Sequence, residues 1–206
     1  MEIWIQQIME QFGYIGVAFL IMIENVFPPI PSEVILTFGG FMTTNTNLTI
    51  TGMIIVSTIG SVIGALILYG VGSFLDITRL EKIVDRWGHI LRLSKKDLHK
   101  ANQWFLKHGV ATVFFCRFIP LIRSLISIPA GMAKMKIGLF LFFTTVGSFI
   151  WNTILIYFGA LVGSNWKVIV YYMSIYSKIA YVIIFIVILA GLIWLLRRKK
   201  KNKMDS

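Results

Sequence analysis

The sequence predicts an all-α, multi-pass membrane protein, and three observations lead to that fold class. Hydrophobic residues make up 57% of the 206 residues and charged residues only 14%, whereas soluble domains carry about 25% charged residues. Several apolar stretches are as long as the roughly 20 residues that a helix needs to cross a bilayer. The 20 Lys and Arg outnumber the 9 Asp and Glu and gather beside these stretches. We therefore expect one membrane domain over residues 1–206.

The first apolar segment, 13–42, is interrupted by prolines and is predicted to be a re-entrant helical hairpin. A short amphipathic helix at the membrane interface is expected before it, over 1–12. Each arm of the segment is too short to cross the membrane alone, and proline ends or kinks a helix. A single kinked span is the alternative, and Ser32 can cap the second arm. The expected turn residues are Pro28, Pro29 and Pro31.

A long apolar stretch over 50–75 is predicted to be a full transmembrane helix. Its Gly60 and Gly64 are spaced to let another helix approach closely. The charged region 76–108 follows and contains eight of the 20 Lys and Arg among scattered aromatic and aliphatic residues. This pattern predicts amphipathic helices at a membrane face, and the excess of positive charge places that face in the cytoplasm.

The second proline-broken segment, 109–135, is predicted to be another re-entrant hairpin, entering from the opposite side to the first. Arg117 and Arg123 lie inside it, between apolar residues. Interrupted hydrophobic segments at matching places in two halves of a chain indicate a transporter built from inverted repeats. The residues expected at the turns of this hairpin are Pro120, Pro129 and Gly131.

Two further transmembrane helices are expected, over 137–163 and 166–196. The tail 197–206 contains six Lys and Arg, which predicts a cytoplasmic C-terminus. With three full spans, and with both hairpins returning to the side they entered from, the N-terminus is expected outside the cell.

The first broken segment carries Glu24 and Glu33, and the second carries Arg117 and Arg123. A charge near the centre of the bilayer costs about 2.5–3.5 kcal/mol or more, so these four are expected to meet. They could serve only as internal salt bridges, although buried pairs seldom add net stability over apolar residues. The functional alternative is that the arginines bind an anionic headgroup through charge-assisted hydrogen bonds. The glutamates, in a low dielectric, would then carry protons.

Other classes of protein are disfavoured by the sequence. The basic clusters lie beside apolar spans, which favours membrane insertion over nucleic-acid binding. The single cysteine, Cys116, excludes an internal disulfide. The three histidines lie in the charged middle without metal-ligand spacing, so no metal and no cofactor are predicted. A lipid phosphatase would need a nucleophilic histidine near basic partners. No such setting is found, and we predict no enzymatic activity.

At these residues the chain resembles the DedA family, also called the VTT or SNARE-associated membrane protein family. The resemblance covers about residues 10–165, and the arginine motif before Pro-Ala-Gly is its most specific part. The matching pieces are Glu24, the PPIPSE turn at 28–33, Gly39-Gly40, F-x-R-F-x-P-x-x-R at 115–123, Pro129-Ala130-Gly131, Met135, and Gly147 with Trp151-Asn152.

The resemblance implies two facing hairpins in a multi-pass cell-membrane protein that moves a lipid. Bacterial members are tied to the recycling of undecaprenyl phosphate, the cell-wall lipid carrier, and to physiology that depends on the proton-motive force. By resemblance, Arg117 and Arg123 bind the anionic lipid while Glu24 and Glu33 couple protons. Alternatives are a phosphatidylethanolamine scramblase or flippase, a cation–proton exchanger, and a membrane assembly factor without transport. A homodimer is also considered. Residues expected to line the cavity are Ser32, Trp151 and Asn152.

Overall fold

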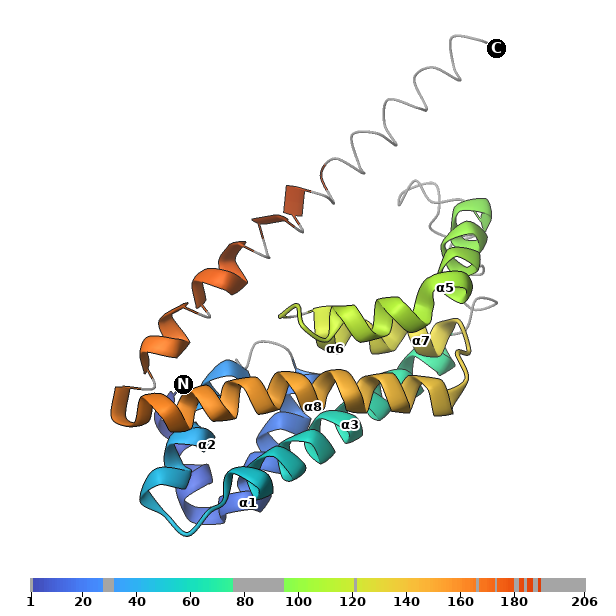
Figure 1. Ribbon diagram of the computed structural model, residues 1–206. Coiled ribbons are helices and arrows are strands. Elements are labelled where there is room, and N and C mark those ends of the chain that lie inside the picture. The colour runs from blue at the N-terminus through green and yellow to red at the C-terminus, as the bar shows by residue number, and fades with distance from the viewer. Residues whose placement is uncertain are drawn as a thin grey trace. The chain divides into compact units, whose positions relative to one another are not determined.

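The computed structural model is all-helical over the residues that it describes, as the sequence predicts. These residues are 2–27, 32–75, 95–120, 122–165, 167–172, 174–179, 182–183, 185–186 and 189, and they contain helices and turns but no strand. The chain divides into two compact units, Met1–Val170 and Tyr171–Ser206. Among the described residues, the helices of 20 or more residues all lie in the first unit (Figure 1). The tail 197–206 and part of the predicted span 166–196 lie outside the described residues.

The first half of the chain forms helices α1 (Glu2–Val26), α2 (Ser32–Asn45) and α3 (Ile50–Phe74). The predicted boundary at residue 13 is a kink inside α1, where Gly13 has a positive φ of 51°. Glycine adopts this conformation without the steric penalty that other residues incur. The predicted proline turn, 28–31, lies outside the described residues.

Both ends of the first broken segment lie beside the start of α3. The hydroxyl group of Thr49 caps α3 by accepting a hydrogen bond from the Gly52 amide at 3.1 Å. The Thr49 amide in turn donates to the Tyr14 hydroxyl at 2.7 Å. Tyr14 follows the kink in α1, and Thr49 comes four residues after Asn45, the end of α2. Residue 14, near the start of the first broken segment, and residue 49, after its end, therefore lie at the same end of α3.

The second half forms α5 (Lys95–Cys116), α6 (Ile122–Leu125), α7 (Ser127–Met132), α8 (Ile137–Val162) and the 3-10 helix η1 (Gly163–Asn165). Helix α5 runs without a break through residues 108 and 109, the boundary expected between the amphipathic region and the second hairpin. No proline interrupts the chain there, so the hydrogen-bond ladder of the helix is not broken. Residues 76–94 of the predicted amphipathic region lie outside the described residues.

Pro120 lies in the turn after α5, where the second segment reverses. Pro129 and Gly131, which we expected at turns, both lie inside α7, so this expectation is corrected. Pro129 is the third residue of α7. The backbone N–H groups of the first four residues have no partner within a helix, so the N–H that proline lacks costs little here. Its ring would clash with the carbonyl group of Leu125, four residues earlier. This explains why α6 ends at Leu125.

The short helices α2 and α7, one from each broken segment, pack against the long helix of the opposite half of the chain. Helix α2 contacts α8, and α7 contacts α3. At each of the two crossings, both helices contribute one glycine, and a Cβ atom on that glycine would collide with a backbone carbonyl oxygen of the facing helix. The same helix contributes that carbonyl's counterpart three residues before its own glycine. The glycine–carbonyl pairs are Gly40 with Ile156, Gly159 with Thr37, Gly131 with Tyr69, and Gly72 with Ile128.

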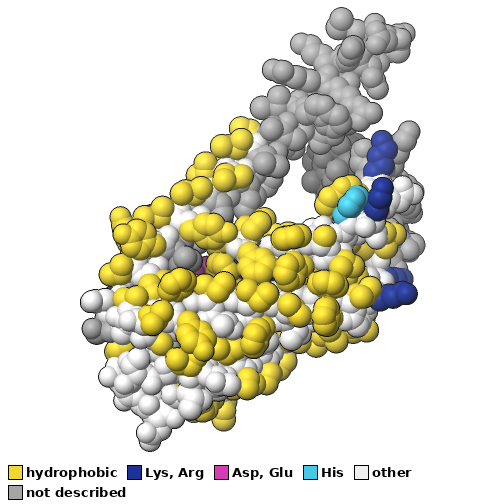
Figure 2. Space-filling model, in the orientation of Figure 1, with side chains coloured by type: hydrophobic (Ala, Val, Ile, Leu, Met, Phe, Trp, Pro, Cys, Tyr) yellow, Lys and Arg dark blue, Asp and Glu magenta, His cyan; other side chains and the backbone are white. Residues whose placement is uncertain are grey.

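Helices α3 and α8 are, in the described part of the chain, the two that are long and apolar enough to cross a membrane. They match the predicted spans 50–75 and 137–163 to within a residue at each end. One face of α3 exposes an aliphatic residue at every fourth position, as lipid contact requires: Ile55, Ile59, Ile63, Ile67 and Val71. Figure 2 shows apolar side chains over much of the described surface in view, with Lys and Arg gathered where α5 and the start of α8 lie.

Candidate functional site

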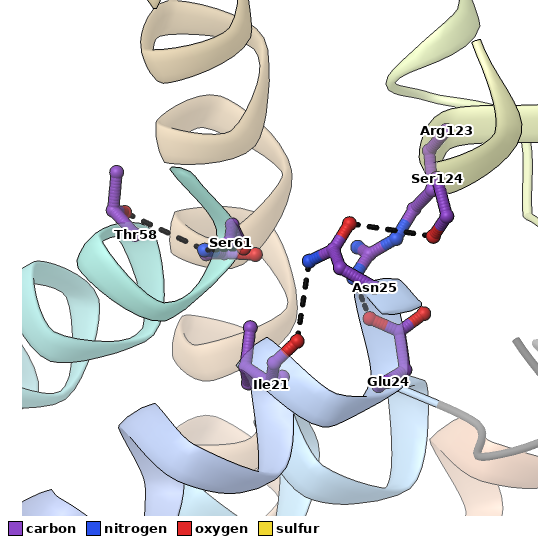
Figure 3. Close-up of polar contacts among 8 residues, drawn as sticks. Ile21, Glu24, Asn25, Thr58, Ser61, Arg123 and Ser124 are labelled. Atoms are coloured by element: carbon purple, nitrogen blue, oxygen red, sulfur yellow. Dashed lines mark hydrogen bonds and ion pairs between the residues drawn. The ribbon is translucent and has the colours of Figure 1, made fainter. Parts of the chain in front are cut away.

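The two broken segments meet at an ion pair between Glu24 and Arg123. Glu24 lies near the end of α1, and Arg123 lies in α6. Nη2 of Arg123 lies 2.5 Å from Oε2 of Glu24, and the side chains are only 4% and 6% exposed for the arginine and the glutamate. Figure 3 shows the two side chains pointing toward each other from their separate helices. The structure therefore brings together one predicted acid and one predicted arginine.

A neutral hydrogen bond lies directly beside this ion pair. The Ser124 hydroxyl donates to Oδ1 of Asn25 at 3.3 Å, and Nδ2 of Asn25 donates to the Ile21 carbonyl at 3.2 Å (Figure 3). Two consecutive residues of α1 thus face two consecutive residues of α6. The Asn25–Ser124 contact was not predicted from the sequence. The only sequence signal for this contact was that Asn25 follows Glu24, and Ser124 follows Arg123, within apolar segments.

Arg117 has a different environment from Arg123. Its side chain is buried, and Nη2 donates to the Ser127 hydroxyl on α7 at 3.1 Å and to the Thr144 hydroxyl on α8 at 3.0 Å. Gly147 of α8 leaves room for it, because a Cβ there would lie 3.0 Å from Cβ and Cγ of Arg117. In the described part of the chain, no carboxylate pairs with this guanidinium. The hydrogen bonds from Arg117 to Ser127 and Thr144 were not predicted from the sequence.

Glu33 lies in the first turn of α2 and is 8% exposed. Among the described residues its carboxylate has no hydrogen-bond or ion-pair partner. It is close enough to Glu24 for the two carboxylates to repel each other, and Arg117 also acts electrostatically on Glu24. Glu24 thus lies within electrostatic range of the other three predicted charges, and we call these four residues the charge cluster. Ser32, buried at the start of α2, lies next to Glu33, where the helix dipole favours a negative charge.

Trp151 and Asn152 are both buried on α8 but have different neighbours. Nδ2 of Asn152 lies 3.4 Å from the hydroxyl oxygens of Thr58 and Ser61 on α3, so this residue joins the two long helices. The Trp151 ring meets Phe118 edge to face, with ring centroids 6.5 Å apart. Phe118 follows Arg117 in the chain. Trp151 thus lies beside the arginine segment, whereas Asn152 belongs to the contact between the long helices.

The charge cluster has hydrogen-bond donors without acceptors. Within the described residues, the buried Nε atoms of Arg117 and Arg123 and Nε1 of Trp151 have no partner. A buried donor that lacks an acceptor costs about 1–3 kcal/mol. The same described residues contain no group of three His, Cys, Asp or Glu side chains able to hold a metal ion.

These features define a helical integral membrane protein whose two broken segments enclose a buried ionic site. The family model of the VTT domain matches residues 30–161. The chain belongs to the VTT-domain family, which is the DedA family that the motifs suggested.

Several relatives match over nearly the whole chain. An "alkaline phosphatase-like protein" of Lactococcus lactis subsp. lactis is 62% identical, with 95% of this chain and 94% of the relative covered. "Undecaprenyl phosphate transporter A" of Staphylococcus aureus is 40% identical, with 98% and 100% covered. The protein of the same name in Bacillus subtilis is 34% identical over 75% of this chain and 74% of the relative. No solved structure matches the chain.

Proposed function

We propose that this protein is a transporter that moves undecaprenyl phosphate across the cell membrane, coupled to protons. The observation that carries the proposal is the buried Arg117, whose guanidinium is held by two neutral hydroxyl groups rather than by a carboxylate. A buried charge without a counter-charge is costly, so the site favours an anionic occupant. Two relatives that are 40% and 34% identical are named undecaprenyl phosphate transporter A. Their names supply the identity of the lipid.

The proposal places the broken segments in the membrane as two opposed re-entrant hairpins. Hydrogen bonds between Tyr14 and Thr49 support a return of the first segment to the start of α3. The Tyr69 hydroxyl, near the other end of α3, donates to the Met135 carbonyl at the end of the second segment at 2.6 Å. The equal spacing of glycine and carbonyl at the two arm crossings supports an inverted repeat. Glu24 and Arg123 then meet between the hairpin tips, away from both membrane surfaces.

The charge cluster suggests how proton and lipid binding are linked. Arg123 is occupied by Glu24 in this structure. A proton on Glu24 would weaken that ion pair and free Arg123 to join Arg117 on the phosphate group. Glu33, which repels Glu24 and lacks a partner among the described residues, would be the second proton carrier. Coupling follows because the carboxylate and the phosphate compete for the same guanidinium.

The proposed orientation has the C-terminus and region 76–108 in the cytoplasm. The gathering of Lys and Arg at the end where α5 and the start of α8 lie supports this orientation (Figure 2). The polar turn between α2 and α3, which contains no charged residue, would then lie outside the cell.

Transport by the purified protein in liposomes tests the proposal. Undecaprenyl phosphate placed in one leaflet is followed to the other with and without a pH gradient. We expect movement by the wild type that a pH gradient accelerates, and at least a tenfold loss in Arg117→Gln. Exposed Lys107 on α5 provides a matched control, since Lys107→Gln also removes one positive charge. Equal transport by Arg117→Gln and the wild type would refute the assignment of Arg117.

The name of the Lactococcus lactis relative, an "alkaline phosphatase-like protein", favours a second candidate, a phosphatase. The same liposomes distinguish it, because hydrolysis releases inorganic phosphate and flipping does not. Parallel liposomes with labelled phosphatidylethanolamine test for a scramblase. Phosphate release, or movement of phosphatidylethanolamine without undecaprenyl phosphate, would replace the transporter proposal.

A further inference from the structure

The two hydroxyl groups that hold Arg117 each keep a proton that has no acceptor among the described residues. Ser127 and Thr144 are fully buried, and both accept a hydrogen bond from Nη2 of Arg117. A hydroxyl group that accepts in this way still has its own proton to donate. Two other fully buried hydroxyls, those of Thr37 and Ser57, donate within their own helices, to the Glu33 carbonyl at 2.5 Å and to the Ile54 carbonyl at 3.1 Å. Ser127 and Thr144 have no such acceptor among the described residues.

The Arg117 guanidinium group adds a third donor, its Nε atom. Nε of Arg117 is buried and has no hydrogen-bond partner among the described residues. The positive charge and the hydroxyl protons of Ser127 and Thr144 come from the turn after α5, from α7 and from α8. Nε of Arg117 and the hydroxyl protons of Ser127 and Thr144 are thus three buried donors without an acceptor among the described residues. Donors of this kind from separate elements, one of them on a cation, make a site for an anion.

The two arginines are not equivalent in this respect. Arg123 has a carboxylate, Glu24, within hydrogen-bond distance. Arg117 has none in the described part of the chain, and its nearest oxygens are hydroxyl groups that can also donate. The resting structure therefore has one arginine neutralised by the protein and one left for an anion from outside.

We infer that Arg117, Ser127 and Thr144 form the subsite that receives the phosphate headgroup, while Arg123 stays with Glu24 until Glu24 takes up a proton. The inference rests on the proposed function and adds two hydroxyl ligands to it. Three donors suit the three terminal oxygens of a phosphate monoester. A phosphodiester headgroup offers two non-ester oxygens and one charge. The subsite therefore favours a lipid monophosphate over a phospholipid.

Binding of farnesyl phosphate, a short prenyl monophosphate, tests the inference on the purified full-length protein. Neutral farnesol serves as the comparison ligand. Because a hydrogen bond to a charged group is worth about tenfold or more in affinity, we expect Ser127→Ala and Thr144→Val each to weaken farnesyl phosphate binding about tenfold. Farnesol binding should not change. Thr144→Ser, which keeps the hydroxyl group, should bind like the wild type.

Ser57→Ala is the matched control, because it also removes a fully buried hydroxyl group, one that donates to its own helix on α3. It should leave farnesyl phosphate affinity unchanged. Equal affinity of the wild type, Ser127→Ala and Thr144→Val for farnesyl phosphate would overturn the inference, while loss of affinity in Arg117→Gln alone would leave the proposed function standing. A wild type that binds farnesyl phosphate no better than farnesol would overturn both. The melting temperature of each variant identifies a change that acts only through folding.

Discussion

The Glu24 carboxylate and the Arg123 guanidinium, 99 positions apart in the chain, form a buried ion pair between α1 and α6. The contact joins the two broken segments directly. Breaking such a pair from one side leaves a buried charge without a partner, which is strongly destabilising. The pair therefore holds the two halves of the chain in one arrangement as well as occupying an arginine of the proposed site.

A double-mutant cycle measures this coupling. Glu24→Gln and Arg123→Gln should each lower the free energy of unfolding by about 3 kcal/mol, because each leaves the other charge buried and unpaired. The double variant should lose clearly less than the sum of the two single losses. Unfolding in mixed detergent micelles provides the measurement. Strictly additive losses would mean that the two side chains do not interact in the folded protein.

The neighbouring contact between Asn25 and Ser124 predicts a cross-link between the two segments. With Cys116 replaced by Ala, the pair Asn25→Cys and Ser124→Cys should form a disulfide on mild oxidation, because the two side chains touch at 3.3 Å. The cross-link should stop transport, and a reducing agent should restore it. Each single cysteine variant is the control for oxidation alone. Full transport by the cross-linked protein would show that the segments need not separate.

The arm crossings predict which glycines tolerate a methyl group. Gly40→Ala and Gly131→Ala should each cost at least about 1–3 kcal/mol of stability, because the new Cβ would collide with a backbone carbonyl of the facing helix. Gly70→Ala is the control, since nothing lies within 4 Å of the added atom. It should stabilise α3 slightly, because alanine is the better helix former. Melting temperatures in detergent would show the contrast, and equal shifts in all three variants would contradict the close crossings.

Room for Arg117 depends on Gly147. A Cβ at this position would lie 3.0 Å from two side-chain carbons of Arg117, so Gly147→Ala should displace the guanidinium from Ser127 and Thr144. We expect the KM for the lipid phosphate to rise several-fold, with a smaller change in the melting temperature. Gly138→Ala on the same helix adds the same methyl group into open space. A KM that changes equally in both variants would contradict a positional effect on Arg117.

Labelling of single cysteines distinguishes a re-entrant first segment from a kinked span. In the Cys116→Ala background, exposed Gln11 and Asn47 flank that segment, and exposed Lys136 precedes α8. An impermeant thiol reagent added outside cells should label Gln11→Cys and Asn47→Cys but not Lys136→Cys. Labelling of Asn47→Cys alone would indicate that the first segment crosses the membrane once.

Much of the fold follows from local features of the sequence. The apolar runs at 50–75 and 137–163 predicted α3 and α8 closely, because length and hydropathy are properties of a continuous stretch. The break at residue 13 was also predictable, since Gly13 begins the first apolar segment. The continuous course of α5 through residue 108 was missed, because a change in composition from charged to apolar does not by itself end a helix.

The sequence by itself determined that the chain is helical and which four charged side chains must be kept away from lipid. Only the tertiary structure decided that Arg123, and not Arg117, pairs with Glu24. It also decided that Ser127 and Thr144 hold Arg117. The physical reason is that an apolar run or a proline acts on its own stretch of chain, whereas the partner of a buried charge depends on how helices far apart in sequence cross. That crossing is set by packing, here by glycines that let the short arms lie against the backbones of α3 and α8.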